Sequence, residues 1–188
     1  MANKVKMGLK NVHYAVVTET PDEAGEIKTT YGPIKAWNGA VNMETSIEGS
    51  NEDFYADDSV YFTAPAPINY SGSFESALIP EDILLSVFHQ TKDETTGLVV
   101  EKNDDVTSYI ALMFEIAGDT SKRRYIFYRC MMSRPNVNGA TTEDSRTPQT
   151  ETVEFTASAR PDDGLVKAYA EEGSTAFTSF FTTVQVPS

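Results

Sequence analysis

The stretch that decides the fold covers residues 122–160 and contains two strand-like segments joined by a polar loop. Residues 124–133 (RYIFYRCMMS) are rich in aromatic and apolar side chains, which indicates a strand buried on both faces. Residues 151–160 (ETVEFTASAR) alternate between apolar and polar side chains, so they predict a strand with one wet face. The buried face would carry Val153, Phe155, Ala157 and Ala159, and the wet face Thr152, Glu154, Thr156 and Ser158.

Residues 134–150 (RPNVNGATTEDSRTPQT) join the two strands and include two prolines, one glycine, two asparagines and five serine or threonine residues. Loops of this length without structure are uncommon inside compact domains, and they are usually functional or disordered until bound. We interpret this loop as an assembly arm that contacts another subunit. The candidate inter-subunit contacts, in the arm and in the basic segment before it, are Arg123, Arg124, Arg134, Asn136, Asn138, Glu143 and Asp144.

The composition indicates one large, well-packed domain. A chain of 188 residues with 40% hydrophobic and 11% aromatic residues can bury a core without disulfides or metals. The single cysteine, Cys130, excludes an intramolecular disulfide framework and suits a reducing compartment. The N-terminal residues are followed by no apolar signal region, and no run of 18 apolar residues occurs, so we expect neither secretion by a signal peptide nor a membrane span.

The charge is strongly acidic and unevenly distributed. Fifteen basic and 28 acidic residues give a net charge of −13, which argues against a surface that grips nucleic acid. Residues 36–91 contain nine acids and no Lys or Arg, whereas residues 122–134 contain five basic residues. The two regions could pair within one molecule as an ordinary solvated surface. Alternatively, they could form complementary faces on neighbouring copies, which would set register and speed association.

The remaining chain is predicted to be mainly β, with one short helix. Residues 80–90 (PEDILLSVFHQ) have proline at a first-turn position, two acids next and an apolar face, which is typical of a short amphipathic helix lying on a sheet. Trp37, the only tryptophan, is predicted to anchor the core or an interface. In residues 41–47, Val41, Met43, Thr45 and Ile47 should face one side, and the apolar positions of this strand should face the core. Further strands are predicted at residues 10–18, 59–63 with a partner around Tyr55, 72–78, 96–101 paired with 106–116, 165–170 and 176–186.

No sequence motif for catalysis is present, including GxGxxG, GxxxxGK[ST], GxSxG, HExxH and CxxC. Asp57–Asp58 and residues 103–105 could hold a hard cation, but turn residues whose side chains bond to the backbone are the simpler interpretation. Cys130 lies within an apolar strand, where a thiol is usually inert. We therefore expect a protein that is not an enzyme, with no catalytic, cofactor-binding or metal-binding residues.

Six segments follow one another in an order that resembles the major tail protein of long, flexible-tailed bacteriophages, in the subgroup found in phages of Gram-positive bacteria. They are MGLKNVHYAVV, YGPIKAWNGAV, YADDSVYF, LIPEDILLSVF, GLVVEKNDDVTSYIALMFEI, and RRYIFYRCMMS with TPQTETVEFTASAR. The resemblance covers nearly the whole chain. It departs from the family at His89 and Gln90, where the family often ends the helix with a glycine.

The resemblance implies a tail-tube subunit that forms hexameric rings, which stack into a hollow tube closed by strands from neighbouring subunits. It implies a two-sheet β-sandwich or partly closed barrel flanked by one helix, here residues 80–90. The expected partners are further copies of this chain and the tape measure, tail terminator and distal tail or baseplate proteins. DNA would pass through without specific binding. The expected location is the tail of the virion, after assembly in the host cytoplasm.

In a tube, an acidic lumen would repel the phosphate backbone during DNA ejection. A ring of six copies at −13 each would carry about −78 charges, far more than solubility requires. Our candidates for lumen-facing acids are Glu44 and Glu48. The same acids could instead lie outside the tube and only keep it soluble.

Two other classes of function remain open at this stage. One is a β-sandwich binding module, for carbohydrate or protein, of a phage particle or a secreted protein. The other is a glycosidase-type hydrolase, if Asp57 and Asp58 converge with Glu75 in a cleft.

Overall fold

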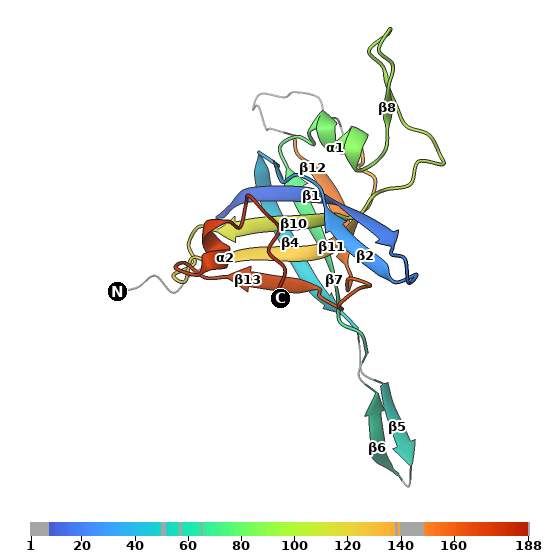
Figure 1. Cartoon of the computed structure of the whole chain (residues 1–188), viewed down its shortest axis with the longest axis vertical. Helices are drawn as coiled ribbons and strands as arrows, with labels where there is room; N and C mark the ends of the chain where they lie inside the picture. The colour runs from blue at the N-terminus through green and yellow to red at the C-terminus, as the bar shows by residue number, and fades with distance from the viewer. Residues whose placement is uncertain are drawn as a thin grey trace.

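The computed structural model describes residues 8–49, 52–56, 58–64, 66–137, 139 and 149–187 (Figure 1). It is mainly β, with 46% strand and 6% helix, as the sequence predicts. The elements in chain order are β1 (Leu9–Pro21), β2 (Ile27–Tyr31), β3 (Lys35–Ala36), β4 (Ala40–Glu48), β5 (Glu52–Ala56), β6 (Ser59–Ala64), β7 (Asn69–Ser76), α1 (Glu81–Ser86), β8 (Thr91–Lys92), β9 (Val99–Val100), β10 (Ile110–Ile116), β11 (Arg124–Met132), β12 (Glu151–Ala157), β13 (Lys167–Ala170) and α2 (Thr175–Thr178).

One large antiparallel sheet, in the order β2-β1-β10-β11-β12-β7-β4, contains most of the strands, and β3 and β13 pair with β1 and β11. Strand β11 connects its two parts. The first residues of β11 pair with β13, in the register Ile126↔Ala168, while its last residues pair on the same edge with β12, in the register Cys130↔Ala157. The sheet therefore changes partner and direction along β11, and it forms two layers that cross without closing into a barrel (Figure 1).

The two predicted strands that flank the polar loop are confirmed as β11 and β12, which pair with each other. In β12, Val153, Phe155 and Ala157 are buried, and the polar residues between them are exposed. The strand ends at Ala157, so the prediction that Ala159 is buried is wrong, and its side chain is exposed. The main core lies between the two layers and α1. Trp37 is buried at its centre, 4.7 Å from the Phe74 ring centroid in an edge-on contact, so the predicted core anchor is confirmed.

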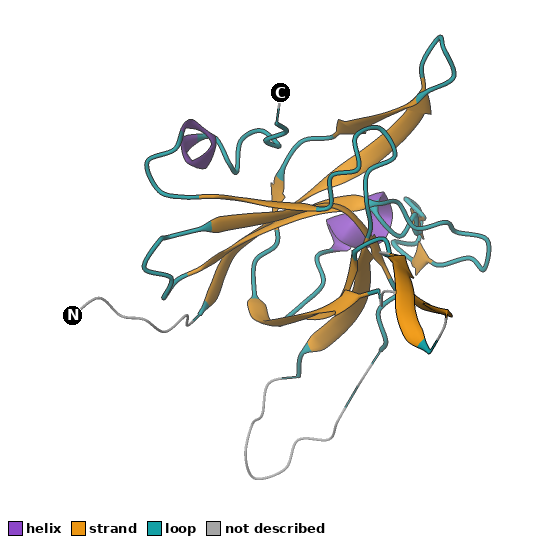
Figure 2. Ribbon diagram, turned by 90° about the horizontal axis from the view of Figure 1, so that it is seen from below, coloured by secondary structure: helices purple, strands orange, loops and turns teal. Residues whose placement is uncertain are grey.

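The first layer, which we define as β1, β10, β11 and β13, also has a covered second face. Residues 171–187, here called the C-terminal cover, place Phe180 against Ala15, Ala111, Met113, Ile126 and Tyr128. The Tyr128 hydroxyl donates a hydrogen bond of 2.7 Å to the carbonyl of Gln185. The cover and α2 lie on one side of this layer, and α1 lies on the other (Figure 2). Burial on both faces explains the apolar run of five residues, 110–114, in β10.

The predicted strand at residues 176–186 is wrong. The Ser174 hydroxyl accepts a hydrogen bond of 3.2 Å from the backbone N–H of Phe177, which caps the short helix α2, and turns follow it. The aromatic side chains of this segment cover the face of a sheet instead of extending its edge. An aromatic-rich segment can either cover the face of a sheet or form a strand at its edge. The sequence alone therefore led to an incorrect prediction of a strand.

Helix α1 is confirmed against the main core through Ile83, although it is shorter than the predicted range of 80–90. The chain leaves the helix at His89, which has a positive φ of 56°, the left-handed conformation usually taken by glycine. The backbone N–H of Gln90 then donates to the carbonyl of Leu84 at 3.0 Å. His89 therefore occupies the helix-ending position at which the resembling family often has glycine, and its Nε2 lies 2.7 Å from the Ser108 hydroxyl.

Two hairpins extend beyond the body of the molecule in opposite directions (Figure 1). The predicted pair around Tyr55 and residues 59–63 is confirmed as the hairpin of β5 and β6. The predicted pairing of residues 96–101 with 106–116 is wrong, because β9 pairs with β8 and β10 pairs with β1 and β11. Strand β10 is apolar on both faces, so it is taken into the centre of the large sheet.

Candidate functional site: an acidic sheet face

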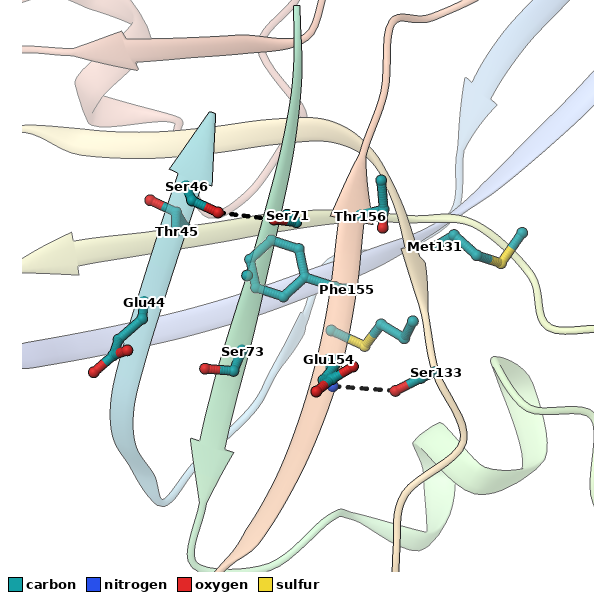
Figure 3. Close-up of a pocket in the computed structure, with 12 residues that line it drawn as sticks. Glu44, Thr45, Ser46, Ser71, Ser73, Met131, Ser133, Glu154, Phe155 and Thr156 are labelled. Atoms are coloured by element: carbon teal, nitrogen blue, oxygen red, sulfur yellow. Dashed lines mark hydrogen bonds between the residues drawn. The ribbon is translucent and has the colours of Figure 1, made fainter. Parts of the chain in front are cut away.

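The second layer, formed by β12, β7 and β4, has one face turned away from the main core. This face is hollowed, with a volume of about 630 Å³ (Figure 3). The residues that line the hollow come from these three strands and the end of β11. They are Glu44, Thr45, Ser46, Ser71, Gly72, Ser73, Met131, Met132, Ser133, Glu154, Phe155 and Thr156. We call the surface formed by Glu44, Ser46, Glu48, Ser71, Ser73, Glu154 and Thr156 the acidic face.

Strand register places the acidic residues in a row across the sheet. Ser73 on β7 lies opposite Glu44 on one side and opposite Glu154 on the other. The row ends at Ser133, whose hydroxyl accepts a hydrogen bond of 3.1 Å from the Glu154 backbone N–H (Figure 3). Two carboxylates thus lie on the same face of neighbouring strands, separated by one serine.

A second row consists mainly of hydroxyl groups. Ser71 lies opposite Ser46 and Thr156, and the hydroxyls of Ser46 and Ser71 are 2.8 Å apart. The Ser71 hydroxyl also lies 2.5 Å from Oε1 of Glu48. Ser71 therefore holds Glu48 on the same face as Glu44. Alternation along β4 agrees with this shared orientation, and the assignment of the two acids to a lumen stays a prediction.

Glycine at position 72 allows the strands beneath this face to pack closely. A Cβ atom there would collide with the carbonyl oxygen of Glu44 and lie 2.8 Å from Cζ of Phe155. The Phe155 ring fills the space that a side chain would take. The hollow therefore depends on a glycine that the sequence analysis did not identify as part of a site.

The prediction that all apolar positions of β4 face the core is wrong. Met43 packs against the main core, but Val41 and Ile47 are 50% and 67% exposed. The pairing of β4 with β7 has a register irregularity between Ala40 and Asn42, which displaces Val41. At the other end, β4 extends beyond the first layer toward the hairpin, so nothing in the described chain covers Ile47 (Figure 1).

No Lys or Arg lines the described hollow. The nearest basic residue along β11, Arg129, is engaged elsewhere. Its Nε lies 2.5 Å from Glu19 on β1, its Nη1 donates to Ser158 at 2.7 Å, and its guanidinium stacks on Tyr109 at 3.6 Å. The carboxylates of the acidic face therefore present a negative surface without a lining cation to neutralise it.

The basic residues that were candidates for contacts between subunits have partners within the chain. Arg123 pairs with Glu171 at 2.8 Å, and Arg134 pairs with Glu101 at 2.8 Å. Arg124 lies 3.5 Å from the buried Glu115 and stacks 3.7 Å from the centroid of the Phe177 ring. The basic cluster therefore pairs within the chain, but with acids outside residues 36–91, so among the described residues it does not pair with the acidic segment as the first interpretation predicted. A role between subunits remains a prediction.

The assembly arm is described only at residues 134–137, 139 and 149–150, where Asn136 is exposed. Asn138, Glu143 and Asp144 lie outside the described residues. The acids proposed for a catalytic cleft are not brought together, because Asp58 lies at the turn of the β5–β6 hairpin and Glu75 lies on β7 in the body. Asp57 is not described.

Of the candidate cation positions, Asp105 accepts a hydrogen bond of 2.7 Å from the Lys102 backbone N–H, which is the predicted role of a turn residue. Among the described residues, no three His, Cys, Asp or Glu side chains gather in a way that could hold a metal ion. In the same part of the chain, no helix is long and apolar enough to cross a membrane. The sequence matches no protein-family model, and a search of curated proteins finds no match.

Proposed function

We propose that this chain is a structural subunit that assembles with copies of itself into stacked rings, and that these rings form the tube of a phage tail through which DNA leaves. The observation that carries the proposal is the acidic face, a concave sheet surface with carboxylates on neighbouring strands and no lining Lys or Arg. A conduit must not bind the polymer that passes through it. A surface that repels phosphate avoids the counterion release that drives binding to DNA.

The position of this face in the sheet supports assembly across subunits. Strand β4 is the last strand at its end of the large sheet, and no described strand pairs with its outer edge. An exposed edge of nine residues is a template for another chain unless it is covered. Closure of the second layer onto the next subunit would cover this edge and place the acidic face on a continuous inner surface. Partners at the two ends of the tube would be the tape measure, tail terminator and distal tail or baseplate proteins.

Electron microscopy of the purified chain over a range of concentrations tests assembly. We expect rings or tubes, because the exposed β4 edge requires a partner. A chain that remains a monomer by light scattering at high concentration, in all salts tried, would contradict the proposal. Compact monomers that bind oligosaccharides would favour a binding module instead, since its hydroxyl-lined hollow also suits a polar ligand.

Charge reversal on the acidic face tests the proposed conduit. The double variant Glu44→Lys/Glu48→Lys should assemble normally but slow DNA exit, and the delay should be larger at low salt, where charges are least screened. The matched control is Glu23→Lys/Glu94→Lys, which reverses two exposed acids on loops away from this face. Ejection kinetics and infectivity provide the measurement. Normal infectivity of the first variant, with normal tails by microscopy, would refute the assignment of these acids to the lumen.

A further inference from the structure

The two ends of the large sheet differ in what covers their outer edges. Strand β4 forms one end with nine residues, and β2 (Ile27–Tyr31) forms the other end with five. No described strand pairs with either outer edge. Unpaired backbone groups at a sheet edge are a template for a strand of another chain, so proteins block such edges with charged side chains or with loops.

The outer edge of β2 is blocked by one carboxylate. The backbone N–H of Thr29, at the middle of the strand, donates a hydrogen bond of 3.1 Å to Oδ2 of Asp162, and the Thr29 hydroxyl donates to Oδ1 at 3.1 Å. Because Asp162 lies outside the ladder of β1 and β2, this N–H is on the outer edge of β2. The central donor that an incoming strand would need is therefore already bonded.

Asp162 is held in place by the loop between β12 and β13. The Arg160 side chain is buried, and it donates to the two carboxylate oxygens of Asp162 from Nε at 2.9 Å and from Nη2 at 2.6 Å. The loop also closes on itself, since the Arg160 N–H donates to the Leu165 carbonyl at 2.9 Å and the Gly164 N–H donates to the Arg160 carbonyl at 3.0 Å. Because the arginine fixes both oxygens, the carboxylate is already ordered where it covers β2.

Without Asp162, the two ends of the sheet would attract each other. Strand β2 (IKTTY) has one basic residue, Lys28, and no acid, whereas β4 (AVNMETSIE) has Glu44 and Glu48 and no basic residue. Opposite charges stabilise paired strands and like charges destabilise them. Asp162 adds a negative charge at the edge of β2, so it repels an incoming β4 and also occupies the N–H that β4 would bind.

We propose that Asp162 is an edge guard, a residue that stops the β2 edge of one copy from pairing with the β4 edge of a second copy. The two edges differ, so their pairing would be heterologous and would extend one sheet from copy to copy. The edge guard prevents this growth and leaves β4 free for another contact. The inference goes beyond the proposed tube and holds whether or not the chain forms one.

Asp162→Ala opens the edge, and Asp163→Ala is the matched control. Asp163 pairs with the same arginine, at 3.2 Å, but accepts its backbone hydrogen bond from Leu165 in its own loop. Light scattering measures association, and infrared spectroscopy detects new strand pairs between molecules. We expect Asp162→Ala to associate at a concentration about tenfold lower than Asp163→Ala does, because the opened edge gains hydrogen bonds to a second strand. Equal association of the two variants would overturn the proposal.

A second change in β2 tests whether the association uses its edge. Thr29→Pro removes the N–H that Asp162 covers, and proline is tolerated where the N–H of an edge strand faces outward. The double variant Asp162→Ala/Thr29→Pro should therefore associate no more than Asp163→Ala. Association that persists in the double variant would place the contact elsewhere and contradict the edge guard.

Circular dichroism checks that each variant is folded. If Asp162→Ala does not fold, Asp162→Asn takes its place, because it keeps the size of the side chain and loses the charge. Its matched control is Asp163→Asn. Asp162→Asn should still associate at the lower concentration, and no difference between these two variants would count against the proposal in the same way.

Charge reversal on β4 tests the identity of the partner strand. In the Asp162→Ala background, Glu44→Lys/Glu48→Lys should weaken the association, because β4 would then repel Lys28. Unchanged association would overturn β4 as the partner.

These experiments are separate from the test of the tube. Wild-type tubes, together with equal association of Asp162→Ala and Asp163→Ala, would remove the edge guard and leave the tube proposal intact. A wild-type chain that forms no rings or tubes, but associates through β2 once Asp162 is replaced, would leave the edge guard intact and remove the tube.

Discussion

The two layers of the sheet differ in what covers their outer faces. The first layer is buried on both sides, by the main core and by the C-terminal cover, and its central strand β10 has no exposed residue. The second layer is buried on one side only, and its other side is the acidic face. Both layers belong to one sheet, in which β11 of the first layer pairs with β12 of the second. The covered layer therefore serves as a scaffold, while the open layer can change its outer side chains with little effect on folding.

The difference in burial between the two layers follows from two distinct patterns in the local sequence. Strand β10 (IALMFEI) is almost continuously apolar, whereas β12 (ETVEFTA) alternates. A continuously apolar strand must be covered on both faces. The C-terminal cover provides the second covering surface, and it has no charged residue from position 175 to 187. An alternating strand demands only one cover. The open face is therefore encoded by the polar positions of β12 themselves.

The largest effect is expected from uncovering the first layer. Phe180 in the C-terminal cover is only 2% exposed, so Phe180→Ala should lower the free energy of unfolding by about 3–5 kcal/mol. The control is Phe62→Ala, the same change at an exposed position, which should alter the monomer by less than about 0.5 kcal/mol. Urea denaturation of dilute monomer measures both. A similar, small effect of the two changes would mean that the cover does not stabilise the layer.

The sequence predicted those parts of the fold that depend on local patterns. The buried strand β11, the alternation of β12 and the helix at Ile83 each follow from a few neighbouring residues. The segment 176–186 was misjudged, because covering a face and extending an edge require the same aromatic residues and differ only in what lies nearby. The partner of β9 was also misjudged, because the sequence does not show that β10 pairs with β1 and β11 instead. Both choices depend on contacts between residues far apart in the chain.

A smaller effect is expected from disturbing the strands beneath the acidic face. Gly72→Ala would push a methyl group against the Glu44 carbonyl and the Phe155 ring, so β4 or the ring must move. Overpacking of this kind typically costs about 1–3 kcal/mol. The matched control is Ser73→Ala, one residue along on the exposed side, which should cost less than about 0.5 kcal/mol. If Gly72→Ala unfolds at the wild-type urea concentration, the close packing of β4 on β7 is not required.

Only some residues of the acidic face could be predicted from the sequence. Alternation along β4 places Glu44 and Glu48 on one face, and this required no knowledge of other strands. Ser71, Ser73 and Glu154 were not identified, although each stands in an alternating segment. Their membership depends on the register between strands that are distant in sequence, and a shift of one residue would move each side chain to the other face.

The smallest expected effect is a loss of stability at low pH. It should come from Asp162, beside the covered layer, and not from the acids of the open face. Asp162 accepts hydrogen bonds from the buried Arg160 and from Thr29 of β2, and these bonds, led by those of Arg160, hold the pKa of its carboxyl well below the usual range. Because the unfolded chain binds this proton more readily, the stability contributed by Asp162 is fully present above about pH 4. It is lost as the pH falls through the lower folded pKa.

Asp162→Asn should therefore be less stable than the wild-type chain by about 1 kcal/mol at pH 6, and the difference should shrink steadily as the pH falls below about 4. Glu154→Gln is the control on the acidic face, since the Glu154 carboxylate pairs with no cation of the described chain, and its difference from wild type should stay near zero throughout. Urea midpoints of dilute monomer at four pH values measure both variants. A constant gap for Asp162→Asn from pH 6 to pH 2 would show that its effect is one of shape and not of charge. A gap that appears for Glu154→Gln would assign part of the acid sensitivity to the open layer.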